Sequence, residues 1–140
     1  FRKGDYAKAV EYYTQAIAKM PERASFYGDL ALVYKKQGKW DLALQELGKA
    51  IRLAPGDPLF RTNRAKVYLA TGKSDEAERE FKEALRIDPA FIYALYELGL
   101  VYHGAGRTEE AKKYWDELMR LHPASREAAE ARSKLGGASV

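Results

Sequence analysis

The chain has 140 residues and contains no cysteine. This excludes disulfide bonds and thiolate metal sites, although it does not identify a cellular compartment. No apolar run approaches the ~18–20 residues that span a bilayer, and no signal-peptide pattern opens the chain. The sequence therefore predicts neither a membrane span nor a disulfide-stabilised fold.

The chain also lacks a large excess of either charge, because its formal net charge is only +4. The excess of lysine and arginine lies within residues 1–55 and is dispersed along them. Nucleic-acid-binding domains usually carry a denser basic stripe. We interpret these charges as a solvated surface and expect no nucleic-acid partner, while the hydrophobic content of 46% is enough for a packed core.

Several residue types recur every 34 residues, and this period dominates the sequence. A period of this length is typical of stacked structural repeats, each of which buries its apolar face only against its neighbours. The columns contain Pro21, Pro55, Pro89 and Pro123; Gly4, Gly38, Gly72 and Gly106; Ala9, Ala43, Ala77 and Ala111; Tyr34, Tyr68 and Tyr102; Ala31, Ala65 and Gly99; and Tyr13, Leu47, Phe81 and Trp115.

Each period predicts two helices. Apolar residues at helical spacing predict a first helix over about 24–36 and a second over about 40–53. Gly38 follows the first helix, where glycine adopts the left-handed cap conformation at little cost, and Pro55 prevents continuation of the second. The whole chain should contain seven stacked helices and a terminal eighth, with no strands. The alanine column at 43, 77 and 111 and the tyrosine column at 34, 68 and 102 should be largely buried.

The residues of the third period resemble the tetratricopeptide repeat. Leu98 and Gly99 followed by Tyr102, then Ala111, Trp115 and Pro123, fit its 34-residue pattern. The resemblance covers residues 1–123 and implies an all-α fold, a right-handed superhelical solenoid of antiparallel helix pairs.

This resemblance predicts a single array spanning residues 1–140. It begins with a half repeat over 1–23, which has the second helix only, and continues with full repeats over 24–57, 58–91 and 92–125. A capping helix is expected over 126–135, with Ser125 as its N-cap and Gly136 and Gly137 ending it. Trp115 and Leu118 are bulkier than their column-mates and would suit packing against this alanine-rich helix.

The resemblance also implies a function, because first helices of this family line a concave groove that holds extended peptides or helices. We expect a scaffold or adaptor module that binds a protein or peptide there, since exposed apolar and aromatic groups in a concavity usually mark a contact site. The groove-facing columns also include Gly28, Thr62 and His103. The candidate binding residues are Leu32, Lys35, Leu59, Asn63, Lys66, Tyr93, Tyr96, Glu97 and Leu100.

Asn63 is the sharpest of these candidates. Asn63-Arg64-Ala65 resembles a segment common in peptide-binding members of the family, in which the asparagine side chain holds a backbone amide of the ligand. Arg64 replaces a leucine of the other repeats, and its stem can still cover apolar surface.

The groove of the family that binds chaperone tails needs four further residues. Gly28, Leu32, Tyr93 and Glu97 occupy the positions where it has lysine, asparagine, lysine and arginine. Glu97 would repel a terminal carboxylate, so the sequence does not predict a chaperone-tail clamp.

Catalysis and metal binding have little support. The two histidines, His103 and His122, lie far apart, and neither has a second ligand at metal-binding spacing. No glycine-rich loop has the spacing that cradles phosphate. We expect no enzyme activity and no cofactor.

A rival hypothesis is a self-assembly or spacer element of a larger multi-domain protein. Tyr6, Val10, Tyr13 and Ile17 form one stripe of the first helix. In an intact repeat this stripe would pack partly on the absent first helix, so it is expected to join two copies of the chain. The alternative is that Tyr6 and Tyr13 fold onto the following repeat and the chain stays monomeric.

Overall fold

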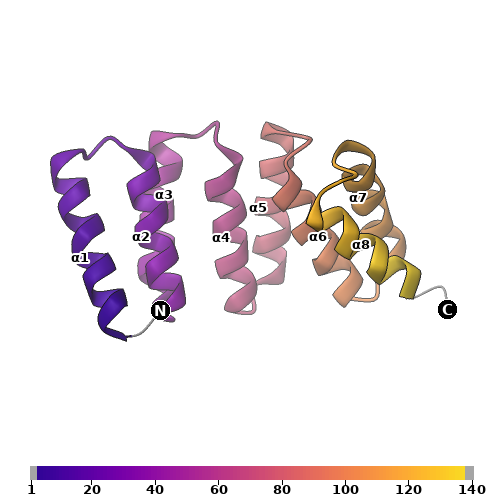
Figure 1. Ribbon diagram of the computed structural model, residues 1–140, viewed down its shortest axis with the longest axis horizontal. Coiled ribbons are helices and arrows are strands. Elements are labelled where there is room, and N and C mark those ends of the chain that lie inside the picture. The colour runs from indigo at the N-terminus through magenta and orange to yellow at the C-terminus, as the bar shows by residue number, and fades with distance from the viewer. Residues whose placement is uncertain (1–2, 138–140) are drawn as a thin grey trace.

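A computed structural model describes residues 3–137, which form eight α-helices and, over that range, no strand. The helices stand side by side in chain order, with α1 at one end of the molecule and α8 at the other (Figure 1). The predicted helix count and all-α class are confirmed. The helices are α1 (Lys3–Lys19), α2 (Ala24–Lys36), α3 (Trp40–Leu53), α4 (Pro58–Ala70), α5 (Ser74–Ile87), α6 (Ile92–Gly104), α7 (Thr108–Leu121) and α8 (Arg126–Gly137).

The turn inside each helix pair is closed by the glycine column. Gly38, Gly72 and Gly106 have φ angles of 75°, 77° and 76°, the left-handed conformation that side chains with a Cβ disfavour. After α2, the Lys39 N–H donates to the Tyr34 carbonyl at 2.8 Å. Together with the hydrogen bond that the Gly38 N–H donates, this bond forms a Schellman motif. The same two bonds recur at the other two glycines. The predicted bounds of α2 and α3 are therefore confirmed.

Capping fixes two other helix starts. The Asp57 carboxylate accepts the Leu59 N–H at 3.0 Å at the start of α4. The Ser125 hydroxyl accepts the Ala128 N–H at 3.0 Å, so the predicted N-cap of α8 is confirmed. The predicted end of α8 is wrong, because the helix continues to Gly137 and Gly136 does not adopt the left-handed conformation that would stop it.

The alanine column lies at the centre of the fold. Ala43, Ala77 and Ala111 are fully buried, as predicted, because each sits where the two helices of a pair approach most closely. The largest helix contacts are those within the pairs α2/α3, α4/α5 and α6/α7. Smaller contacts join successive pairs, and the buried apolar residues form three clusters in sequence along the array.

The tyrosine column is only partly as predicted. Tyr102 is buried, whereas Tyr34 and Tyr68 are half-buried. The Tyr102 hydroxyl donates to Glu78 at 2.5 Å, and its ring stacks on Tyr114 with a centroid distance of 5.7 Å. In the earlier periods a glutamate replaces Tyr114 and an aliphatic residue replaces Glu78, so these two tyrosines lack that cover.

The C-terminal helices form a separate cluster around Trp115. Its indole fills the space that Gly99 leaves open, where a Cβ would fall inside the van der Waals radius of the indole nitrogen. The indole N–H donates to the Tyr96 carbonyl at 3.1 Å. Helix α8 covers this cluster with two fully buried alanines, Ala128 and Ala131. The predicted packing of Trp115 against α8 is confirmed.

Candidate functional site

The first helices of the three pairs share one face that carries exposed apolar side chains. Leu32 on α2 is 44% exposed, Leu59 on α4 is 39% exposed and Tyr93 on α6 is 50% exposed. On α4, Asn63 and Lys66 follow Leu59 by four and seven residues, which places all three on one side of that helix. We call this surface the α2–α4–α6 face and define it by Leu32, Lys35, Leu59, Asn63, Lys66, Tyr93 and Glu97.

Polar side chains connect the three helices across this face. The Lys66 ammonium lies 3.9 Å from a Glu97 carboxylate oxygen, joining α4 to α6. Between α2 and α4 lies a small cavity lined by Lys35, Asn63 and Lys66. Burial lowers the pKa of Lys35, and the positive charges of Lys66 and Lys36 lower it further, against the opposing effect of Glu97. The structure thus brings together predicted residues from all three helices.

Asn63 faces this cavity while its neighbour points elsewhere. Within residues 3–137 the Asn63 carboxamide makes no hydrogen bond. Arg64 forms an ion pair with Glu80 of α5, which also accepts a hydrogen bond from Arg61 at 3.2 Å. Arg64 therefore joins α4 to α5 within the second helix pair, a role that the sequence did not indicate.

Two of the predicted binding residues are held in the C-terminal cluster. The Tyr96 hydroxyl donates to Glu130 of α8 at 2.5 Å, and its ring stacks on Trp115. Burial and the Glu130 hydrogen bond raise the pKa of Tyr96 to about 12. Leu100 packs against the same C-terminal cluster. Both residues are half-buried, so at α6 the predicted site merges with the capping contacts.

Other residues in the groove-facing columns lie inside the fold. Gly28 is buried beneath Phe60, and Thr62 is buried with its hydroxyl bonded to the Pro58 carbonyl at 2.9 Å. Gly28 nevertheless lines the cavity between α2 and α4 with its backbone, whereas the placement of Thr62 in the groove was wrong, because its side chain is buried. The His103 ring lies 5.3 Å from that of Trp115, and its buried Nδ1 has no partner within residues 3–137.

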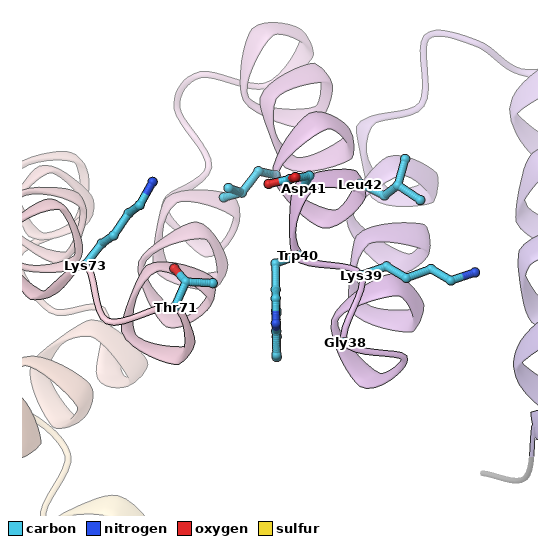
Figure 2. Close-up of a pocket in the computed structure, with 8 residues that line it drawn as sticks. Gly38, Lys39, Trp40, Asp41, Leu42, Thr71 and Lys73 are labelled. Carbon is cyan, nitrogen blue, oxygen red and sulfur yellow. The ribbon is translucent and has the colours of Figure 1, made fainter.

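Sequence reasoning missed a second concavity at the edge of the array. Figure 2 shows Trp40 standing between the turn at Gly38 and the turn that carries Thr71 and Lys73. The space measures about 490 Å³. Its signal was present in the sequence, because Trp40 occupies a column that holds Ser74 and Thr108 in the two later repeats and another aromatic residue, Tyr6, in the half repeat before it.

Residues 3–137 contain no cluster of three or more histidine, cysteine, aspartate or glutamate side chains able to hold a metal ion. Nor does any helix in that range have the length and apolar character needed to cross a membrane.

Antiparallel helix pairs stacked in one direction and closed by a single end helix define an α-solenoid repeat protein. The chain belongs to the tetratricopeptide repeat family: one model of that repeat matches residues 1–67 and 35–82, a second matches 66–106 and a third matches 92–125. Proteins with this fold are typically non-enzymatic protein-interaction modules.

Solved structures agree with this assignment. The first tetratricopeptide domain of Spaghetti (RPAP3), bound to the HSP90 peptide SRMEEVD, is 28% identical with a TM-score of 0.73; the match covers 84% of this chain and 96% of that one. A thermophilic tetratricopeptide protein of Thermus thermophilus, TTC0263, is 24% identical with a TM-score of 0.82, over 94% of this chain and 74% of that one. The Arabidopsis OM64 domain is 22% identical with a TM-score of 0.71, over 81% of this chain and 94% of that one.

Proposed function

We propose that this chain is a scaffold or adaptor module that binds an extended segment of a partner protein across the α2–α4–α6 face. The observation that carries the proposal is that each first helix exposes one large apolar side chain: Leu32 on α2, Leu59 on α4 and Tyr93 on α6. Apolar side chains that water solvates poorly, interspersed with polar groups, are typical of binding surfaces.

Asn63 supports an extended ligand. Its carboxamide has both a donor and an acceptor, which match the two groups of a backbone amide. Asn63 and the exposed Leu32 line the same cavity between α2 and α4, and the Asn63 carboxamide has no hydrogen bond in the described part of the chain. The RPAP3 domain, which holds a peptide, provides a precedent among similar structures.

The HSP90 peptide itself does not follow from that precedent. Gly28 is buried under Phe60 and offers no side chain to a ligand, while Tyr93 and Glu97 replace the cations that a tail carboxylate needs. We therefore propose a different segment as the ligand, with its own side-chain preferences.

A display library of random 12-residue peptides, held inside a carrier protein, tests this function. Selected peptides should lose at least about tenfold in affinity on Leu59→Ser, because a leucine-sized contact is worth more than ~1.4 kcal/mol. Asn63→Ala should cost about 1–2 kcal/mol of affinity. Tyr96→Ala should cost more than that if the tyrosine is a hot spot for the ligand in addition to its contact with α8.

Leu53→Ser is the matched control, since Leu53 is 43% exposed but lies at the end of α3. Peptides selected on the wild-type chain should bind Leu53→Ser with unchanged affinity. Failure to select any peptide, or peptides equally indifferent to Leu59→Ser and Leu53→Ser, would sink the proposal.

Self-association through α1 is the second candidate, and one observation favours it. Tyr12 is 64% exposed, the highest value among the large apolar residues of the described chain that remain exposed. The stripe of Tyr6, Val10, Tyr13 and Ile17 is half-buried, as expected if it folds partly onto the following helix. Sedimentation of the wild-type chain and of Val10→Lys tests self-association. A wild-type dimer that becomes a monomer in Val10→Lys supports it, whereas monomers in both cases exclude it.

A further inference from the structure

The cavity between α2 and α4 has an unusual lining for a place within a helix stack. Its floor is apolar, formed by Ala31, Leu47 and Val67, whereas its rim carries three polar side chains, Lys35, Asn63 and Lys66. Polar groups at the edge of an apolar hollow usually fix the orientation of a ligand group.

The two lysines are poorly compensated. Lys35 is half-buried, and no ion pair to it forms within residues 3–137. In the described part of the chain, the one ion pair of Lys66 is its 3.9 Å contact with Glu97, at the outer limit for such a pair. A half-buried ammonium beside a like charge is unfavourable until a negative group joins it.

We infer that this cavity receives the carboxylate of an aspartate or glutamate side chain from the partner segment, an inference that rests on the proposed function. Lys35 and Lys66 donate to the two carboxylate oxygens. Asn63 holds the peptide group beside the acidic residue, and Leu32 contacts its methylene carbons.

The size of the cavity favours a carboxylate over a larger anion. Its water-accessible space is only about 30 Å³. One water needs roughly 10–15 Å³ by this measure, so there is room for about two oxygen atoms. A carboxylate, with two oxygens and one charge, matches this space more closely than a phosphoryl group does, and Glu97 beside Lys66 disfavours a ligand with many negative charges.

The same peptide library tests the inference. Peptides selected on the wild-type chain should share an aspartate or glutamate at one fixed position. Changing that residue to its amide should weaken binding about 10- to 100-fold, as for other hydrogen bonds to charged groups. Selection on Lys35→Gln/Lys66→Gln should yield apolar peptides without the acidic position.

Lys112→Gln/Lys134→Gln is the control, because it removes two positive charges from exposed positions on α7 and α8. It should keep the acidic preference. Two outcomes overturn this inference and leave the proposed function intact. In the first, the selected peptides depend on Leu59 but share no acidic position. In the second, they share an acidic position and keep it when Lys35 and Lys66 are replaced. An absence of Leu59-dependent peptides overturns both.

The free protein offers a second measurement. Since the half-buried ammonium of Lys35 is unfavourable without a ligand, Lys35→Met should raise Tm by about 1–3 °C while it abolishes the acidic preference. A fall in Tm would mean that Lys35 already has its partner within the chain, and would overturn the inference.

Discussion

The two ends of the solenoid are closed in different ways. At the C-terminal end, α8 lies over α6 and α7, and Trp115, Leu118, Ala128 and Ala131 are excluded from solvent. At the N-terminal end, α1 packs on α2, and within its described residues no side chain reaches full burial. Helix α8 contacts two helices, α6 and α7, whereas α1 packs mainly on α2, so less of the α1 surface is removed from water.

Residue size explains why the C-terminal end seals well. In the column of small residues, Gly99 replaces the alanines of the earlier repeats. In the column of large residues, Trp115 replaces Leu47 and Phe81. The enlarged aromatic then meets the short side chains of α8, so the gap is filled without strain. The α1 end instead retains an exposed aromatic residue, Tyr12.

The largest expected effect comes from truncating the tryptophan. Trp115→Ala should destabilise the fold by about 3–5 kcal/mol, because it leaves a cavity beneath α8. Tyr13→Ala, on half-buried α1, should cost only about 1 kcal/mol. Urea denaturation followed by circular dichroism measures both. Equal losses would show that the two ends are equally well packed.

Adding a single carbon should distinguish tight packing from helix propensity. Gly99→Ala should cost about 1–3 kcal/mol, because its Cβ would overlap the Trp115 ring. Gly48→Ala, in the interior of α3 with its nearest neighbour atom 3.7 Å from the added carbon, should instead stabilise by about 0.5–1 kcal/mol. Thermal unfolding of the two variants gives the signs. A stabilising Gly99→Ala would contradict the proximity of the indole.

Loss of the α8 cap should have an intermediate effect confined to one end. Ser125→Ala removes the acceptor for the Ala128 N–H and should cost about 1 kcal/mol. Hydrogen exchange should quicken in α8 and leave the α1 amides unchanged. Faster exchange at both ends would mean that the array unfolds as one unit.

The smallest effect is the pH dependence of the Tyr96–Glu130 contact. The pKa of Tyr96 is raised from 10.0 to about 12 in the folded chain. Its contribution is therefore fully present below pH 10 and is lost as the pH rises from 10 to about 12. The stability difference between wild type and Tyr96→Phe should therefore shrink as the pH rises from 10 to about 12. A constant difference would show that the phenol does not hold α8.

The sequence predicted repeated features better than unique ones. Gly38, Ala43 and Pro55 each act within their own helix pair, so their columns located the turns, the core and the helix ends. Tyr96 was different, because its hydrogen bond depends on how α8 lies over α6. No column contains that information, since α8 follows the last repeat.

The candidate site was predictable only in outline. Helical spacing correctly grouped Asn63 with Lys66, but it could not show that Lys35 of the preceding first helix lines the same cavity. That proximity depends on the distance between successive helix pairs, which the sizes of Gly28 and Phe60 help to set. A column describes one helix face, and contacts between columns appear only in three dimensions.

The glycine turns have a consequence for synthesis on the ribosome. Each is closed by hydrogen bonds between residues no more than five positions apart, so a helix pair needs no distant segment to form. As translation proceeds at about 5–20 residues per second, each pair can fold soon after its second helix leaves the exit tunnel. Among the described helices, α1 emerges before α2, the helix on which it packs, whereas α8 emerges after α6 and α7 and docks on a surface that they have already formed.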